Sequence, residues 1–156
     1  MVRIVLGLLL GGLAMAQQQA PDPVEAALAR QDYQAAIGML RPLADRGDAA
    51  AQSLLGELYL AGQGVTQSNA EALNWLRKSA AQGFAPAQYT IGMMYASGRG
   101  VKQDFAEAVG WMRGAADRGI ADAQRDLGLM YHQGQGVPRD YAQSLSWYRK
   151  IGRAHV

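Results

Sequence analysis

The stretch GQGV at residues 62–65 decides how this 156-residue chain is organised, because it recurs as GRGV at 98–101 and as GQGV at 134–137. The copies are spaced 36 residues apart, and other residue types recur in the same register. Two more glycine series, a tyrosine series and a tryptophan series share it: Gly47, Gly83 and Gly119; Gly56, Gly92 and Gly128; Tyr59, Tyr95 and Tyr131; Trp75, Trp111 and Trp147. A period of this length predicts a solenoid of similar stacked units.

Each unit has the pattern of two helices. In the first, Ala51, Leu55, Leu58 and Tyr59 are spaced as one face of an amphipathic helix. The second helix begins with a short polar residue that an acid or amide follows three positions later: Ser68 and Glu71, Asp104 and Glu107, Asp140 and Gln143. This spacing predicts a capping box, in which both side chains bind free backbone amides at the helix start.

The glycines of the repeat are explained by helix geometry. Gly62 and Gly64 are expected to reverse the chain with positive φ angles between the two helices. Gly56 lies inside the first helix, where glycine costs about 1 kcal/mol relative to alanine, so we expect close approach of a partner helix, with the tryptophan filling the space beside it. A nucleotide-binding loop is excluded, because the glycines follow a helix and no Lys-Ser/Thr pair follows them.

A degenerate half-unit precedes these repeats. The stretch DYQAAIGMLRPLADRG at 32–47 aligns with DFAEAVGWMRGAADRG at 104–119. Asp32 then takes the capping position and Met39 the tryptophan position. The predicted organisation is a degenerate N-terminal repeat at 24–46, repeat 1 at 47–82, repeat 2 at 83–118 and a truncated repeat 3 at 119–150.

The repeated pattern resembles the Sel-one-like repeat family, a relative of the tetratricopeptide repeats. Residues 49–80, 85–116 and 121–150 are similar to that family's unit, with small departures such as Ser68 for aspartate and Ile91 for leucine. The resemblance implies an all-α, right-handed α/α superhelical solenoid whose usual work is to hold other proteins together. Some exported, disulfide-rich relatives have been linked to β-lactam binding or hydrolysis, but this chain has no cysteine.

The N-terminus has the pattern of a secretory signal peptide. Arg3 supplies a positive start, residues 4–13 are apolar, and Ala14-Met15-Ala16 is a small-x-small cleavage site. A membrane anchor is disfavoured, because about 20 apolar residues are needed to span a bilayer. The pattern predicts cleavage after Ala16, a flexible leader at 17–23, and a periplasmic or secreted protein with no membrane span after cleavage.

Composition favours a globular protein with no attraction to nucleic acid. Hydrophobic residues make up 49% of the chain and charged residues 18%, which argues against disorder. Basic and acidic residues are equal in number between 17 and 150, because Arg3 and Arg153 lie outside that range. A neutral chain lacks the basic surface that nucleic acid or anionic membrane would attract.

The last six residues, IGRAHV at 151–156, match one reading frame of a common short-read sequencing adapter. This match predicts that they are an artefact and that the natural chain continues beyond Lys150; a naturally short last helix is the alternative. By register the third unit would then stop within its second helix, leaving the face of Leu145 and Trp147 open to self-association. Trp111, flanked on both sides, is expected to stabilise the fold more than Trp147.

No catalytic site, metal site or cofactor is predicted. His132 alone cannot form a triad or a metal site, and none of the common nucleophile or metal-binding motifs occurs. Asp122 and Asp126, near the start of a helix, are expected to be solvated charges that the helix dipole favours. The strict registers of the tyrosines and tryptophans favour a role in the core.

Function is therefore expected on a surface, and the chain is predicted to be a non-enzymatic protein–protein interaction or scaffold module. In the related superhelices the first helices line a concave groove, which suits an extended peptide or a partner helix. Carried over by register, the concave groove is lined by Ser53, Glu57, Leu60, Tyr89, Met93, Ala96, Arg125, Leu129 and His132. Two alternatives remain, the repeat arm of a larger cell-envelope protein whose C-terminal domain is missing, and a β-lactamase-like hydrolase.

Overall fold

The computed structural model describes residues 22–153, so the predicted signal peptide lies outside the described residues. Within that range the chain forms eight helices and no strand. They are α1 (Pro23–Ala29), α2 (Tyr33–Asp45), α3 (Ala49–Ala61), α4 (Asn69–Ala81), α5 (Ala85–Ser97), α6 (Phe105–Asp117), α7 (Ala121–Gln133) and α8 (Tyr141–Arg153).

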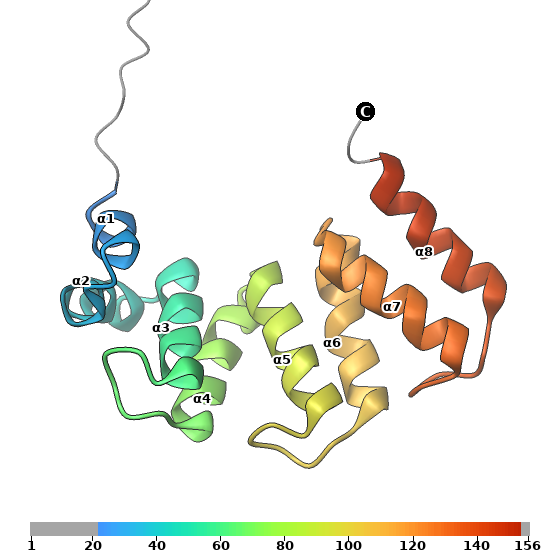
Figure 1. Cartoon of the computed structure of the whole chain (residues 1–156), viewed down its shortest axis with the longest axis horizontal. Helices are drawn as coiled ribbons and strands as arrows, with labels where there is room; N and C mark the ends of the chain where they lie inside the picture. The colour runs from blue at the N-terminus through green and yellow to red at the C-terminus, as the bar shows by residue number, and fades with distance from the viewer. Residues whose placement is uncertain (1–21, 154–156) are drawn as a thin grey trace, which may run out of the picture.

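The helices stack in chain order into a curved solenoid, and each packs mainly on its neighbours in sequence (Figure 1). Successive first helices, α3, α5 and α7, begin 36 residues apart at Ala49, Ala85 and Ala121. The predicted all-α solenoid is confirmed. None of the helices between residues 22 and 153 combines the length and apolar character that a bilayer crossing requires.

The paired glycines form the turns between the helices of each repeat, with the positive φ that the sequence predicts. Gly62 ends α3 with φ of 68°, and Gly64 follows with φ of 70°. The turn also packs on the preceding repeat, because a Cβ at Gly136 would overlap the carbonyl oxygen of Phe105 at the start of α6. A residue other than glycine would therefore be strained and would clash with backbone.

The capping prediction is half right. The Ser68 hydroxyl accepts from the amide of Glu71 at 3.2 Å, and the Asp140 carboxylate accepts from Gln143 at 2.9 Å. In a full capping box, the acid or amide side chain three residues later would accept a hydrogen bond from the backbone amide of the cap residue. Here the backbone amides of the cap residues bind other groups. The backbone amides of Ser68, Asp104 and Asp140 donate to the backbone carbonyls of Tyr59, Tyr95 and Tyr131 at 3.0, 3.0 and 2.9 Å. The short turn brings these carbonyls within reach, and the cap thereby closes the turn.

The mid-helix glycines allow close helix contact, but the tryptophans do not fill the space beside them as predicted. A Cβ at Gly56 would lie 2.6 Å from Leu76 Cγ, and one at Gly92 would lie 2.7 Å from Met112 Cγ. The side chain that contacts the glycine therefore belongs to the residue directly after the tryptophan, Leu76 after Trp75 and Met112 after Trp111. Successive side chains point in directions about 100° apart on a helix, so the tryptophan itself faces elsewhere.

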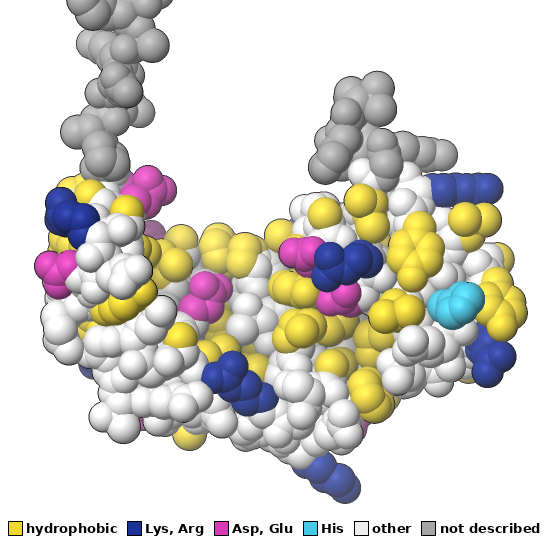
Figure 2. All heavy atoms as spheres, in the orientation of Figure 1, with side chains coloured by type: hydrophobic (Ala, Val, Ile, Leu, Met, Phe, Trp, Pro, Cys, Tyr) yellow, Lys and Arg dark blue, Asp and Glu magenta, His cyan; other side chains and the backbone are white. Residues whose placement is uncertain are grey.

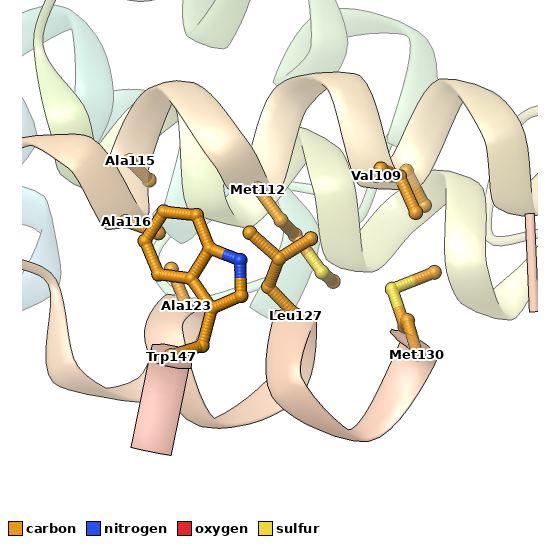
Figure 3. Packing of buried hydrophobic residues seen from close by; sticks show 9 residues of the cluster. Val109, Met112, Ala115, Ala116, Ala123, Leu127, Met130 and Trp147 are labelled. Atoms are coloured by element: carbon orange, nitrogen blue, oxygen red, sulfur yellow. The ribbon is translucent and has the colours of Figure 1, made fainter. Parts of the chain in front are cut away.

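Each tryptophan instead faces the preceding repeat. The three core clusters cross the repeat boundaries, as in the cluster of α6 and α7 that Trp147 completes. Figure 3 shows the Trp147 indole among the small side chains Ala116 and Ala123 and beside Leu127. Trp75 completes the cluster of α2 and α3 in the same way, whereas Trp111 is only partly buried against α4 and α5.

This burial contradicts the expectations that the Trp147 face is open and that Trp111 stabilises the fold more than Trp147. Trp75 and Trp147 are 7% and 6% exposed, and Trp111 is the least buried of the three. Trp147 also cannot serve an open face for self-association, because it is already covered by its own chain. α8 has 13 residues like α4 and α6, and its last three residues are the first three of the segment IGRAHV at 151–156.

The tyrosines are only half-buried and connect the repeats through their hydroxyl groups, rather than lying in the core as predicted. The Arg41 guanidinium donates to the Tyr59 hydroxyl at 2.8 Å, and Arg77 donates to Tyr95 at 3.2 Å. Arg113 and Tyr131 repeat the contact. A second helix thus holds the first helix of the next repeat.

Candidate functional site

The first helices α3, α5 and α7 carry all nine predicted positions of the concave groove. These helices lie at the front in Figures 1 and 2. Figure 2 shows hydrophobic side chains over them, interrupted by acidic and basic groups, and the molecule is hollowed between its two ends. An apolar area with a polar rim is typical of a surface that meets another protein.

Met93 and Leu129 are the large exposed apolar side chains of this surface. They are 42% and 43% exposed and occupy the same register in consecutive repeats. Solvent contact of such side chains is unfavourable, and close to half of each side chain remains in contact with solvent. Among the nine predicted groove positions they expose the most apolar side chains.

A hollow of about 190 Å³ lies beside Met93, where α3 meets α5. Leu60, which is buried, and Met93 line it together with Thr90, Met94, Ser97 and Arg99. The Arg99 guanidinium donates to the Leu60 carbonyl at the end of α3. The structure thus brings two predicted groove residues, Leu60 and Met93, to one small cavity.

A polar network joins α5 to α7 across the groove. The Tyr89 hydroxyl donates to Asp126 Oδ2 at 2.8 Å, and Arg125 Nε donates to Asp126 Oδ1 at 3.1 Å. Arg125 also pairs with Asp122 at 2.7 Å. Burial, the hydrogen bond and the charge of Asp126 raise the pKa of Tyr89 to about 12. The expectation that Asp126 is a merely solvated charge is therefore wrong.

Glu57 occupies the register of Met93 and Leu129 one repeat earlier. Its side chain has solvent-exposed area, yet desolvation by the surrounding protein raises its pKa. The two observations agree if the carboxylate stands on a concave surface, where water reaches it but protein atoms surround it. A carboxylate in that position favours a basic partner.

The remaining groove positions differ in what they expose. Ser53 is buried, because it has the register of Tyr89 and Arg125 but lacks their length to reach the surface. Ala96 is half-buried and packs against the core cluster of α6 and α7. His132 is exposed, and its ring meets Tyr141 edge-on with the ring centroids 5.2 Å apart.

Sequence reasoning missed Asp126, Thr90 and Arg99 as parts of this surface. Asp126 and Thr90 share a register position but differ in type, so the repeat contains no signal for them. Arg99 lies inside GRGV, where the other two copies have glutamine. That difference is the one feature of the sequence that could have indicated a role for Arg99 in this surface. Across residues 22–153, no group of three or more histidines and acids could hold a metal ion.

Comparison with known families identifies the repeat. A model described as the Sel1 repeat matches four consecutive segments, residues 21–48, 49–84, 85–120 and 121–154. The chain belongs to the Sel1 repeat family. Sel1 repeats are typically protein–protein interaction modules and generally not catalysts.

Solved structures agree with this assignment. A protective antigen of uropathogenic Escherichia coli strains with an SLR fold is 42% identical, with a TM-score of 0.73 over 76% of this chain and 25% of that chain. A Sel1 repeat protein from Oxalobacter formigenes is 34% identical, with a TM-score of 0.79 over 83% of this chain and 54% of its own. This chain therefore spans a quarter to about half of their length.

Cysteine-rich protein B of Helicobacter pylori shares the fold at 17% identity, with a TM-score of 0.58 over 85% of this chain and 89% of its own. At that identity the likeness shows the fold alone. No curated protein matches this chain.

Proposed function

We propose that this Sel1 repeat protein is an exported interaction module that binds an extended peptide or a partner helix in the concave groove. The observation that carries the proposal is the exposure of Met93 and Leu129 at one register position of neighbouring first helices. Methionine adapts its shape to different apolar surfaces. The two side chains therefore suit a partner with apolar anchors spaced to match two repeats.

Charged groups at both ends of this apolar pair would set the direction of the partner. Glu57 stands on the N-terminal side, where burial disfavours its isolated negative charge. Arg125, held by Asp122 and Asp126, stands on the C-terminal side. A partner with a basic group near Glu57 would relieve the cost of burying that carboxylate, and an acidic group would favour the Arg125 end.

Export is supported by the N-terminal pattern of a short basic start, an apolar run and a small-x-small site. A periplasmic or secreted location follows from that pattern. N-terminal sequencing of the protein recovered from the culture medium or periplasm tests it, and a new N-terminus at Gln17 is the expected result. Recovery in the cytoplasm with Met1 intact would contradict export.

A second candidate is the repeat arm of a larger cell-envelope protein, because the two relatives above 30% identity are much longer than this chain. Reading the source DNA across and beyond the codon of Lys150 decides between the two. Further repeats or another domain in frame would favour the arm, and its partner would then be sought with the completed chain.

The groove is tested by selecting peptides from a random library on the purified chain beginning at Gln17. Selected peptides are then measured against Met93→Ser/Leu129→Ser, which removes both apolar side chains. A matched control is Leu145→Ser, since Leu145 is 47% exposed but lies on α8. We expect the double variant to weaken binding at least about tenfold, or 1.4 kcal/mol, and the control to leave it unchanged. Equal binding to all three proteins would overturn the groove assignment.

A further inference from the structure

The tryptophans of the second helices are covered differently in the three repeats. On α4 the ammonium of Lys78 lies 4.2 Å from the ring centroid of Trp75, and on α8 the ammonium of Lys150 lies 3.6 Å from that of Trp147. Each lysine follows its tryptophan by three residues, so both project from the same side of the helix. A cation over an indole face is attracted by the electrons of the ring.

The middle repeat lacks this cover. Gly114 takes the register position of Lys78 and Lys150. Among residues 22–153, no lysine or arginine side chain lies over the Trp111 ring. Trp111 is accordingly only half-buried. The indole face that the other repeats cover with their own lysines is thus open on α6.

A hollow of about 400 Å³ occupies the vacated space, and we call it the Trp111 hollow. It is lined by Gln88, Ala106, Glu107, Gly110, Trp111 and Gly114. The hollow in the same register of α8, to which Lys150 contributes, measures about 200 Å³. A Cβ at Gly110 would have nothing within 4 Å, so the middle of the hollow is free of packed side chains.

We propose that the Trp111 hollow binds the basic side chain of a protein partner, a lysine or arginine whose cation lies over the Trp111 indole. The protein itself shows the geometry, because Lys78 and Lys150 hold the corresponding place on the other two tryptophans. This site is separate from the concave groove, since its tryptophan and glycines belong to α6 and the groove residues to α3, α5 and α7.

The charges around the hollow favour a cation at one end. Glu107 lines it and makes no ion pair within the described part of the chain. Arg118 is held at the opposite, C-terminal end of α6, where it donates to the Gly114 carbonyl at 3.0 Å and to Gln88 Oε1 at 3.5 Å. The incoming cation would therefore lie towards Glu107 and away from Arg118.

The test observes the indole N–H resonances of the three tryptophans in ¹⁵N-labelled protein beginning at Gln17. The probe is the peptide acetyl-Gly-Lys-Gly-amide, and the control probe is the same peptide with its lysine ε-acetylated, at equal ionic strength. We expect a saturable shift of the Trp111 resonance with the charged peptide and much smaller shifts of Trp75 and Trp147. No shift of Trp111 would overturn the proposal, and equal shifts with both peptides would assign the hollow to a neutral ligand.

Two variants assign the response to the hollow. Gly114→Lys supplies the missing lysine and should abolish the Trp111 shift, and it should fold, because the nearest atom to a new Cβ is the flexible end of Gln88 at 2.9 Å. Glu107→Gln should weaken binding several-fold without moving the free resonance much. The groove variant Met93→Ser/Leu129→Ser should respond like the unsubstituted protein. A Trp111 shift that survives Gly114→Lys would overturn the proposal without affecting the groove.

Discussion

One position that faces a neighbouring helix keeps its character in all three repeats, whereas a predicted groove position two residues away on the same helix changes. Leu55, Ile91 and Leu127 share one register and are all fully buried aliphatic residues. Two residues further along, the groove register has an acid, a thioether and an aliphatic side chain, in Glu57, Met93 and Leu129. Packing against a neighbour limits shape and polarity, while a solvent-facing position of the same helix is under no such limit. The groove can therefore differ chemically along its length without loss of the fold.

The largest expected effect compares two tryptophans of the same register. Trp75→Ala should lower the free energy of unfolding by about 3–5 kcal/mol, because the indole completes a core cluster. Trp111→Ala should cost clearly less, because its indole is half-buried and uncovered. Urea denaturation followed by circular dichroism measures both losses. If the two losses were equal, burial would not be what separates the repeats.

Two glycines of neighbouring helices sharpen the contrast between packed and open positions. Gly92→Ala should destabilise by about 1–3 kcal/mol, because the new Cβ would lie 2.7 Å from Met112 Cγ and 3.3 Å from the Ala108 carbonyl oxygen. Gly110→Ala should stabilise by up to about 1 kcal/mol, because it has free space and alanine is the better helix former. Thermal melts should move in opposite directions, and a shift in the same direction would contradict the close approach at Gly92.

The sequence predicts what every repeat shares and misses what one repeat has alone. The 36-residue period, the turn glycines and the cap residues recur, so packing must require them in each unit, and the helices follow. The contact between Tyr89 and Asp126 occurs once, because the corresponding positions in the preceding repeat are Ser53 and Thr90. A repeat pattern contains no information about such a pair.

The uncovered Trp111 is a different case, because its signal was present in the sequence. Lys78, Gly114 and Lys150 share a register, and a glycine that replaces lysine beside a tryptophan predicts an open indole face. The direction of the tryptophans towards the preceding repeat could not be predicted in the same way. It depends on the angle at which consecutive helices pack, and the period alone leaves that angle open.

The link between α5 and α7 should have a smaller and pH-dependent effect. Tyr89→Phe should cost about 1 kcal/mol near neutral pH, because the hydrogen bond to Asp126 is lost. Folding raises the pKa of Tyr89 from 10.0 to about 12, so the folded state holds this proton more tightly than the unfolded state. The stability due to Tyr89 is therefore complete below pH 10 and falls as the pH rises from 10 to about 12. Urea midpoints over this range should decline less in Tyr89→Phe than in the unsubstituted chain, and parallel curves would contradict the link.

The smallest expected effect on stability belongs to the groove itself. Met93→Ser and Leu129→Ser should each change the free energy of unfolding by less than about 0.5 kcal/mol, because surface positions outside packed contacts are usually near neutral. Met94→Ser is the matched control at the next residue of α5, and it should be strongly destabilising because Met94 is buried in the core. Urea denaturation of the three variants separates the cases. If Met93→Ser and Leu129→Ser lower the free energy of unfolding as much as Met94→Ser does, the two side chains contribute to packing between the repeats. Packing would then be enough to explain why these positions are apolar. If they are neutral while peptide binding is lost, the apolar character of these two positions acts in binding and contributes nothing to the fold.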